Sequence, residues 1–375
     1  MADDVRVEGS ATLFRLLDVG YAIALDRAAV LLGESTRGRV LPAGVDARAI
    51  EIRNPPLFAT LGTFPITVCG AQHSASLSAH LFDFGVCSLR LNVPLPAGLS
   101  WSALTDFASG LEGSPDPAAI FDREVPLLLD RIAAATERPR LAAVSEEYRV
   151  YRIDRLIGGD GRRVAVPPVE LLSEEQLVSL LVGERRKLST TARRELAPFR
   201  FSYYEDDLTV LTWESALVVE PRQEDRDVEY VLEFANAQLL ELRLYDSQLD
   251  AELPGLYDRV AAARMRARPR LAGRFRAVLS DLQTRVADVT ETVERVENAL
   301  KVTNDVYLAR VYAAALELFR EQAWRHGVER KLGILRETYV MLNSEAQAGR
   351  AELLEIAIVV LIVAELVLGL LRGRA

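Results

Sequence analysis

The sequence predicts an α+β protein with a mixed N-terminal body of strands and helices, followed by long coiled-coil helices and a C-terminal transmembrane helix. Three observations predict this order. Short segments of alternating polarity occur in the first 160 residues, heptad spacing of apolar residues begins near residue 279, and an apolar run extends from Leu353 to Leu371. Half of the 375 residues are hydrophobic, which is enough for a sizeable core.

The N-terminal body contains one especially clear strand at residues 86–93. Its apolar residues, which point one way, are Cys87, Leu89, Leu91 and Val93, and its polar residues, which point the other way, are Ser88, Arg90 and Asn92. We therefore expect one buried and one solvated face, with Gly85 in a preceding turn or bulge. Further strands are expected at 49–52, 148–153 and 208–219, and helices at 26–32, 101–111 and 120–134, with Ser100 capping the second helix.

Composition divides the chain into four parts. Residues 158–163 and the prolines Pro167 and Pro168 indicate a linker, and Ser173 begins a capping box for a helix that runs to about Glu184. The expected parts are an α+β domain at 1–165, an α+β continuation at 166–258 with a helix at 227–252, a coiled-coil region at 259–350 and a membrane anchor at 351–375.

The helix expected at 227–252 has two stripes at helical spacing. The apolar stripe contains Val231, Ala235, Leu239, Leu242 and Leu249, and the polar stripe contains Glu229, Glu233, Asn236, Arg243, Ser247 and Asp250. The polar stripe is interpreted as a solvated face. The alternative is an interaction surface, for which Glu233, Asn236 and Arg243 are the candidate residues.

A basic cluster follows this helix, between positions where Pro254 and Pro269 are expected to interrupt helices. It contains Arg264, Arg266, Arg268, Arg270, Arg274 and Arg276. Closely spaced cations suit anionic lipid headgroups or RNA phosphates, and a solvated face with ion pairs is the alternative. The net charge of −9 argues against a protein whose whole surface coats nucleic acid.

Two heptad series predict coiled-coil helices. The first contains Leu279, Leu282, Val286, Val289, Val293, Val296 and Leu300, and its helix is expected to continue to about Arg325, with a break at His326–Gly327. The second contains Leu332, Leu335, Tyr339, Leu342, Ala346, Leu353, Ile356, Val360, Val363, Val367 and Leu370.

The run from Leu353 to Leu371 fits a membrane span. Its 19 residues would extend roughly 28 Å as a helix, close to the ~30 Å of a bilayer core. The central Glu365 costs about 2.5 to 3.5 kcal/mol, whereas each Leu, Ile or Val contributes about 0.3 to 0.6 kcal/mol. The predicted span residues are Leu353, Ile356, Val360, Val363, Glu365, Val367 and Leu370. A soluble zipper is the alternative, but the run is apolar on all sides.

Little in the sequence suggests catalysis. No phosphate loop, metal cluster or nucleophile motif has the required spacing, so we expect no enzyme activity and no cofactor. His73 and His80 would point to opposite faces of one strand, and Cys69 and Cys87 are interpreted as small buried hydrophobes. The acidic residues 205–207 fit a turn better than a cation site, and Asp246 with Asp250 fits either solvated carboxylates or an acid and base pair.

Five segments resemble one known family. They are 82–89 (FDFGVCSL), 207–214 (DLTVLTWE), 234–242 (FANAQLLEL), 331–339 (KLGILRETY) and 354–365 (LEIAIVVLIVAE). Together they resemble the "required for meiotic nuclear division" family, whose helix carries an Ala-x-Ala-Gln core, matched here at Ala235, Ala237 and Gln238. The resemblance implies a membrane-associated, non-catalytic protein, with a translation-supporting role in mitochondrial relatives, and it makes Gln238 a further candidate interaction residue.

Three functions follow as hypotheses. The first is a single-pass, tail-anchored scaffold or adaptor that self-associates as a homo-oligomer, contacts membrane lipid and an unidentified protein partner, and keeps its bulk in the cytoplasm, since residues 1–6 do not resemble a signal peptide. The second is a membrane tether for RNA or ribosomes through residues 264–276. The third is an undetected metal-dependent hydrolase near Asp206 and Asp246.

Overall fold

The fold is taken from a computed structural model of the whole chain. It describes residues 5–33, 50–52, 54–164, 166–184, 186, 188–197, 199–222, 226–265, 280, 283–284, 286–291, 294, 300–302 and 305–372; for 50–52, 256–265, 300–302, 345–346, 348–354 and 367–372 only the backbone is described. The chain divides into two compact units, residues 1–244 with 294–324, and residues 245–293 with 325–375.

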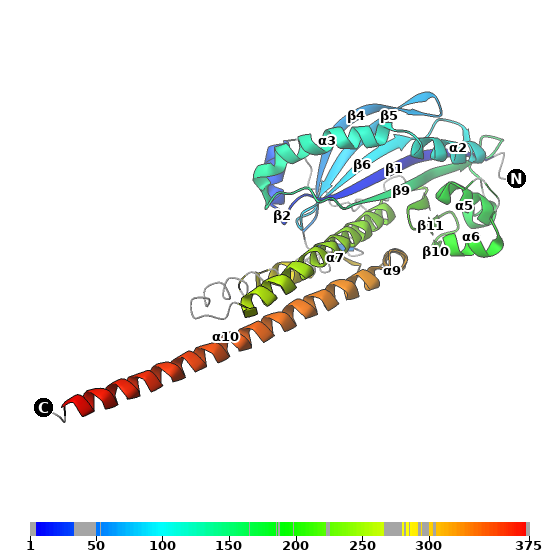
Figure 1. Cartoon of the computed structure of the whole chain (residues 1–375). Helices are drawn as coiled ribbons and strands as arrows, with labels where there is room; N and C mark the ends of the chain where they lie inside the picture. The colour runs from blue at the N-terminus through cyan, green and yellow to red at the C-terminus, as the bar shows by residue number, and fades with distance from the viewer. Residues whose placement is uncertain are drawn as a thin grey trace. The chain divides into compact units, whose positions relative to one another are not determined.

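Nine strands in the described part of the first unit form one mixed sheet (Figure 1). The strands are β1 (Arg6–Asp18), β4 (Leu57–Val68), β5 (Ala71–Leu81), β6 (Val86–Pro94), β7 (Leu99–Ser100), β9 (Ser145–Ile157), β10 (Phe199–Phe201), β11 (Leu208–Leu211) and β12 (Ser215–Val219). Their order is β10-β11-β12-β9-β1-β6-β5-β4, with β7 paired to β1. The β9–β12 pair is parallel and the other pairs are antiparallel.

Two short ribbons lie outside the large sheet. Strand β2 (Ala22–Ile23) pairs with β8 (Thr136–Glu137), and β3 (Ile50–Ile52) pairs with β13 (Leu300–Val302). The helices are α1 (Leu25–Leu32), α2 (Trp101–Glu112), α3 (Asp116–Ile132), η2 (Ala133–Ala135), α4 (Pro168–Leu171), α5 (Glu174–Val182), α6 (Thr190–Leu196), α7 (Asp227–Met265), α9 (Val306–Leu318) and α10 (Glu321–Arg372).

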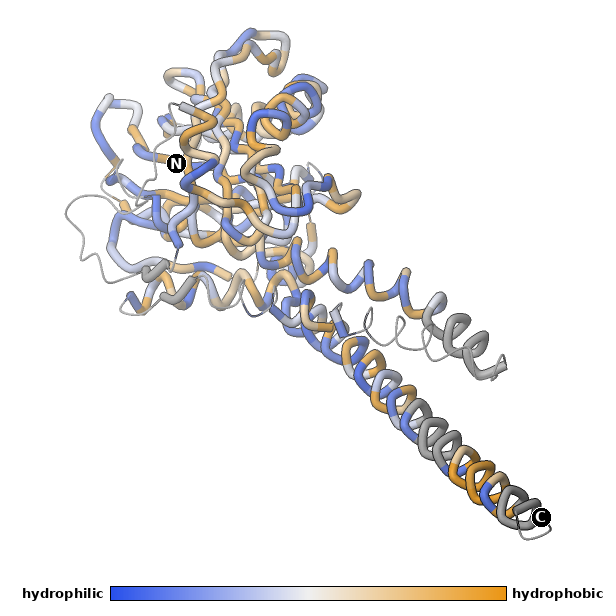
Figure 2. Tube along the Cα trace, turned by 90° about the vertical axis from the view of Figure 1, so that its left-hand side faces the viewer, coloured by the Kyte–Doolittle hydropathy of each residue, from blue (hydrophilic) through white to orange (hydrophobic). Residues whose placement is uncertain are grey.

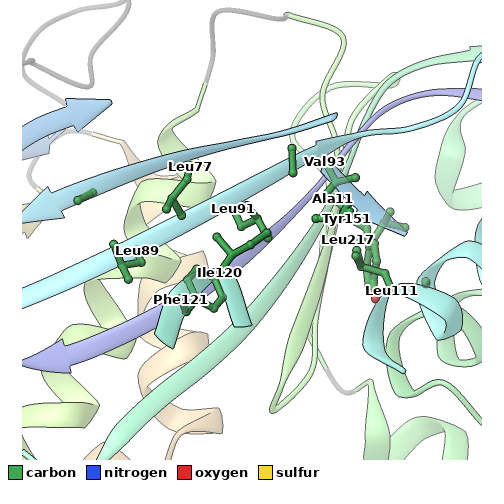
Figure 3. Packing of buried hydrophobic residues seen from close by; sticks show 14 of the residues in the cluster. Ala11, Leu77, Leu89, Leu91, Val93, Leu111, Ile120, Phe121, Tyr151 and Leu217 are labelled. Carbon is green, nitrogen blue, oxygen red and sulfur yellow. The ribbon is translucent and has the colours of Figure 1, made fainter. Parts of the chain in front are cut away.

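Helices α1, α2, α3 and α5 cover one face of the sheet. The predicted caps position two of these helices: the Ser100 hydroxyl accepts from the Ala103 amide, and Ser173 with Gln176 forms a capping box. Apolar side chains of β5 and β6, including Leu77, Leu89 and Leu91, face Ile120 and Phe121 of α3 (Figure 3). This layer forms the largest apolar core of the first unit.

The opposite face of the sheet packs against the first part of α7 and against α9. Its core contains Phe14, Tyr148, Val150, Phe234, Leu240, Val311 and Phe319 among others. Because both faces are covered, the polar side of β6 is not solvated: Ser88 is fully buried and Arg90 is mostly buried. The strand at 86–93 was predicted correctly, but the expectation that its polar face is exposed to solvent was wrong.

Other expectations are corrected locally. Residues 208–219 form two strands rather than one, because Thr212 and Ser215 close a turn in which the Thr212 amide donates to the Ser215 carbonyl. Pro254 lies inside α7, since a proline removes only one backbone hydrogen bond from a long helix. The break expected at His326–Gly327 lies instead at Phe319–Arg320, where Arg320 has a φ of 53°.

The expected linker near 160–170 lies within the first compact unit. Residues 158–163 do form a turn, in which the Gly158 amide donates to the Arg162 carbonyl. Strands β9 and β12, on either side of it, pair with each other in the same sheet. The loop therefore connects parts of one structural body.

The second unit contains an apolar cluster of its own. Leu332, Leu335 and Leu342 of α10 pack against Tyr245 and Leu249 of α7, together with Val289 and Val328. This part of the predicted second heptad series therefore packs against other residues of the same chain. In the first series, Leu300 lies in strand β13 rather than in a helix, and Leu279, Leu282, Val293 and Val296 lie outside the described residues.

An ion-pair cluster joins the same two helix segments. The Lys331 ammonium lies 2.6 Å from Asp246 Oδ1 and 2.7 Å from Asp250 Oδ1, and it donates to the Asp246 carbonyl. A Cβ at Gly327 would lie 2.8 Å from Asp246 Oδ1, so this glycine permits the close approach. The α+β class and the helical C-terminal region are thus confirmed. Within the described residues, no helix is long and apolar enough to cross a membrane.

Candidate functional site

A row of polar side chains crosses the face of the sheet that α7 covers. His80 comes from β5, Arg90 from β6 and Arg152 from β9. Between them, Asn92 donates to the hydroxyls of Ser10 at 3.1 Å and Thr12 at 2.9 Å. Along each strand these polar residues alternate with apolar residues that face α3. Successive side chains of a strand point to opposite faces of a sheet, so the polar residues share the other face.

Helix α7 places two carboxylates over this row. Glu229 and Glu233 are four residues apart and therefore share one face of the helix. Glu233 Oε2 lies 2.8 Å from His80 Nδ1 and 3.7 Å from Arg90 Nη1. Glu229 accepts from Arg90 Nη2 at 3.3 Å and from Arg226 Nη1 at 2.8 Å. The helix and the sheet are thus joined by opposite charges.

Arg152 has the most partners of this network. Its Nε donates to Asp154 at 2.7 Å, its Nη1 to Glu229 at 3.3 Å, and its Nη2 to the carbonyl oxygens of Glu220 and Arg222. Only 1% of the side chain is exposed. The guanidinium therefore holds both the start of α7 and the segment that leads into it from β12.

The network sets the charge of its members. Burial alone would raise the pKa of Glu233, but the electrostatic attraction of His80 and Arg90 together with hydrogen bonds from His80 and Ser88 outweighs burial and holds this pKa below its ordinary value. Burial, with a smaller contribution from Glu233, raises the pKa of Cys87 to about 12. The Cys87 thiol is therefore protonated at neutral pH and unsuited to nucleophilic chemistry.

This network is structural rather than a solvent-facing interaction surface. Glu229, Glu233, Asn236 and Gln238 are all buried, so the solvated-face interpretation was wrong for the first half of the stripe. Gln238 accepts from Tyr312 at 2.7 Å and donates to Glu321 at 3.4 Å. Ser247 and Asp250, farther along α7, are exposed as predicted.

Arg243, the remaining candidate residue of α7, lines a polar cavity of about 430 Å³. The cavity lies beside β1 and β9 and also contains Arg15, Arg149 and Trp213. Arg243 pairs with Glu146, and Arg149 pairs with Glu112 at 2.5 Å and Glu214 at 3.1 Å. The three guanidinium groups each have an acidic partner, since Arg15 pairs with Asp122 and Glu147.

The predicted span residues lie on α10. From Ile356 to Leu366 the described apolar side chains are exposed, and Figure 2 shows them as an orange stretch before the C-terminus. Ile356 is 54% exposed, Val360 60% and Val363 53%. Glu365 is also exposed. The side chains of Leu353, Val367 and Leu370 lie outside the described residues.

The basic cluster is not described at the level of side chains. Arg264 lies within α7, of which only the backbone is described there, and Arg266, Arg268, Arg270, Arg274 and Arg276 lie outside the described residues. Binding of RNA or lipid by these arginines stays a prediction from the sequence.

The remaining chemical candidates are dispersed. His73 packs on Phe107 and His80 on Glu233, on opposite faces of β5 as predicted. Cys69 is exposed in the β4–β5 turn, against expectation, whereas Cys87 is buried. Asp206 pairs with Arg163, Asp246 pairs with Lys331, and the described residues contain no group of three metal-ligating side chains.

Comparison with known proteins places this fold in a family. Residues 8–226, more than half of the chain, match the family described as "Uncharacterized protein MJ0711, N-terminal domain". The chain belongs to this family. The matched range comprises the large sheet with α1 to α6 and ends immediately before α7.

The chain is also similar to "Uncharacterized protein MJ0711" of Methanocaldococcus jannaschii. It is 24% identical over 198 residues, which cover 52% of this chain and 59% of the relative. The chain thus spans less than two thirds of the relative's length. No solved structure matches the chain.

The family assignment corrects the resemblance drawn from short segments. The chain is a member of the MJ0711 N-terminal domain family and not of the "required for meiotic nuclear division" family. Short apolar segments such as 354–365 have a composition shared by many terminal helices, so they discriminate families poorly. The match across residues 8–226 spans a whole sheet and is therefore decisive.

The depressed pKa of Glu233 predicts a pH dependence of stability. A carboxyl whose pKa is lower in the folded state stabilises the fold above its ordinary pKa of about 4.5, and this contribution is lost as pH falls through the folded pKa. The difference in free energy of unfolding between the native chain and Glu233→Gln should therefore be largest near neutral pH and shrink below pH 4.5. Urea denaturation at several pH values measures it.

Glu146 supplies a control of opposite sign. Burial raises its pKa, although Arg243 opposes the shift. A raised carboxyl pKa makes the folded state lose stability as pH rises, so the difference between the native chain and Glu146→Gln should decrease with increasing pH. A difference for Glu233→Gln that stays constant from neutral pH to pH 3 would contradict the charge assignment.

Proposed function

We propose that this protein is a non-catalytic scaffold or adaptor held at a membrane by the apolar segment of α10. The observation that carries the proposal is the set of exposed apolar side chains between Ile356 and Leu366. Six consecutive residues, 358–363, are each more than half exposed. At 3.6 residues per turn they point in every direction around the helix.

Water is an unfavourable environment for such a segment. Removing apolar surface from water is favourable by roughly 25 cal/mol per Å². Between Ile356 and Leu366, eight large apolar side chains are exposed, so their burial in an apolar environment would be favourable. The proposed span includes residues 353–354 and 367–371, whose side chains lie outside the described residues, and it therefore rests on the sequence, since the described residues alone contain no span. The sequence stays predominantly apolar from Leu353 to Leu371, and 19 residues in a helix extend roughly 28 Å. This length suits a bilayer core of ~30 Å.

A bilayer fits better than a bundle of helices in water. The outward positions of a soluble coiled coil are polar, whereas Val359, Leu361 and Ile362, which neighbour the heptad positions Val360 and Val363, are exposed and apolar. The packed positions of the same series, such as Leu335 and Leu342, contact the chain's own second unit. If α10 associates with a second copy of the chain, we therefore expect only residues after Leu342 to form that contact.

Fractionation of cells tests membrane attachment. The full chain should sediment with membranes and resist an alkaline wash, whereas a chain ending at Glu352 should be released. The double substitution Val360→Lys with Val363→Lys should also release the chain, because each central lysine costs about 2.5 to 3.5 kcal/mol of insertion free energy.

Val340→Lys is the matched control, since Val340 is 65% exposed on the same helix but outside the apolar segment. It should leave the chain in the membrane fraction. A full chain that is monodisperse in buffer without detergent would overturn the proposal, and so would equal sedimentation of the full and truncated chains.

A further inference from the structure

Three tyrosines form adjoining walls of a second cavity in the first unit. Tyr203 and Tyr204, in the turn between β10 and β11, have ring centroids 4.8 Å apart and planes at 87°. The Tyr307 ring, at the start of α9, lies 5.9 Å from Tyr203 at an interplanar angle of 55°. The cavity has a volume of about 240 Å³, somewhat below the range of roughly 300 to 1,000 Å³ that is usual for ligand pockets, so its ligand must be compact.

The same cavity is lined by more acidic than basic groups. Its carboxylates are Asp207, Glu220, Asp227 and Asp305, and its cations are Arg152 and Arg222. Arg152 is also paired outside the cavity lining, with Asp154 and Glu229. Asp207 accepts hydrogen bonds from the backbone amides of Tyr203 and Tyr204, and Asp305 accepts one from the amide of Leu308. Burial raises the pKa of Asp207 despite these hydrogen bonds.

The chain already places a cation against one wall. The Arg222 guanidinium lies 5.2 Å from the centroid of the Tyr204 ring, within the range of a cation–π contact. Arg222 is also paired with Glu220 at 3.2 Å. Aromatic rings and carboxylates thus cooperate here to hold a positive group. The Tyr203 ring, which is 65% exposed, presents a further aromatic surface beside it.

The cavity is formed by segments that are far apart in the chain. It lies where β12 ends, at Val218 and Glu220, and where α7 and α9 begin. Strands β12 and β9 form the parallel pair of the sheet.

We propose that the cavity lined by Tyr203, Tyr204 and Tyr307 binds an organic ammonium group of a small molecule. The face of an aromatic ring is electron-rich and attracts a cation, whereas its edge is electropositive. The Tyr203 ring, which is 65% exposed, is therefore the expected aromatic contact of the ligand. Carboxylates at the margin add a long-range attraction that a neutral molecule of the same shape would not experience. This proposal does not depend on membrane attachment.

Choline and its neutral isostere 3,3-dimethylbutan-1-ol are the probes. The full chain, purified in a detergent without a choline headgroup, should bind choline in isothermal titration calorimetry and bind the isostere roughly tenfold more weakly. Tyr203→Ala should weaken choline binding by a similar factor. Tyr203→Phe, which keeps the ring, should change the choline affinity by less than about twofold.

Trp213→Ala controls for the loss of an exposed aromatic side chain elsewhere, because Trp213 is exposed but does not line this cavity. It should leave choline binding unchanged. Circular dichroism of each variant establishes that it is folded. The proposal is overturned if choline produces no binding heat, if the isostere binds equally well, or if folded Tyr203→Ala retains the full affinity for choline.

Discussion

Replacing Arg152 by methionine is expected to lower the free energy of unfolding by about 3 to 5 kcal/mol, the range for breaking a buried ion pair from one side. Methionine approximates the length of the arginine stem, so the loss reflects charge and hydrogen bonding more than volume. Glu229 would lose its contact with Arg152, and the carbonyl oxygens of Glu220 and Arg222 would lose their donor.

The size of this effect follows from burial. Arg152 and Glu229 are each 1% exposed, so water cannot replace the missing partner without opening the contact between α7 and the sheet. In the variant, Arg226 and Arg90 would still donate to Glu229, so the buried carboxylate would keep two of its positively charged partners. We therefore expect the variant to remain folded in the absence of denaturant, with a lower midpoint of urea unfolding.

Arg155→Met is the matched control on the same strand. Its side chain is 59% exposed and pairs with Glu8 at 3.5 Å, and such surface pairs contribute about 0 to 1 kcal/mol. Denaturant unfolding followed by far-ultraviolet circular dichroism compares the two. Similar losses for Arg152→Met and Arg155→Met would show that the buried network does not stabilise the fold as described.

Local patterns in the sequence predicted the elements whose determinants are local. The alternation at 86–93 predicted β6, and the capping residues Ser100 and Ser173 predicted the starts of α2 and α5. These signals lie within a few residues of the element that they specify. The sequence alone could therefore provide much of the secondary structure in the first unit.

The buried charge network was missed because its parts are far apart in the chain. Glu233 contacts His80, 153 residues earlier, and Glu229 contacts Arg152, 77 residues earlier. Charges four residues apart on a helix are indistinguishable from a solvated face until the oppositely charged surface is known. The available signal was the set of basic residues at polar positions of separate strands, His80, Arg90 and Arg152, together with the acidic stripe of α7.

Because such contacts join distant parts of the chain, the residues that match the family model, 8–226, do not contain the whole hydrophobic core. Residues 8–226 contain the sheet, but the apolar side chains that cover Phe14, Tyr148 and Val150 come from α7 and α9. His80, Arg90 and Arg152 also depend on carboxylates that follow residue 226. In this chain, residues 227–244 of α7 are therefore an integral layer of the first unit.

Gly85→Ala is expected to destabilise the fold by roughly 3 kcal/mol, the upper end for a residue held in a sparsely populated backbone conformation. Gly85 has a φ of 94° in the turn between β5 and β6, where its amide donates to the Phe82 carbonyl. A Cβ at this position would lie 2.0 Å from the Gly20 carbonyl oxygen, so a methyl group would also force two backbone segments apart. Thermal and urea unfolding of the variant measure the loss.

Gly98→Ala separates the two causes. Gly98 has a φ of 72°, but a Cβ there would meet no atom within 4 Å, so this substitution introduces backbone strain without a collision. It should cost about 1 to 2 kcal/mol, the penalty of the left-handed conformation for alanine. A loss at Gly85 no larger than that at Gly98 would mean that residues 20 and 85 can separate freely, and the close packing of the β5–β6 turn against residue 20 would then not contribute to stability.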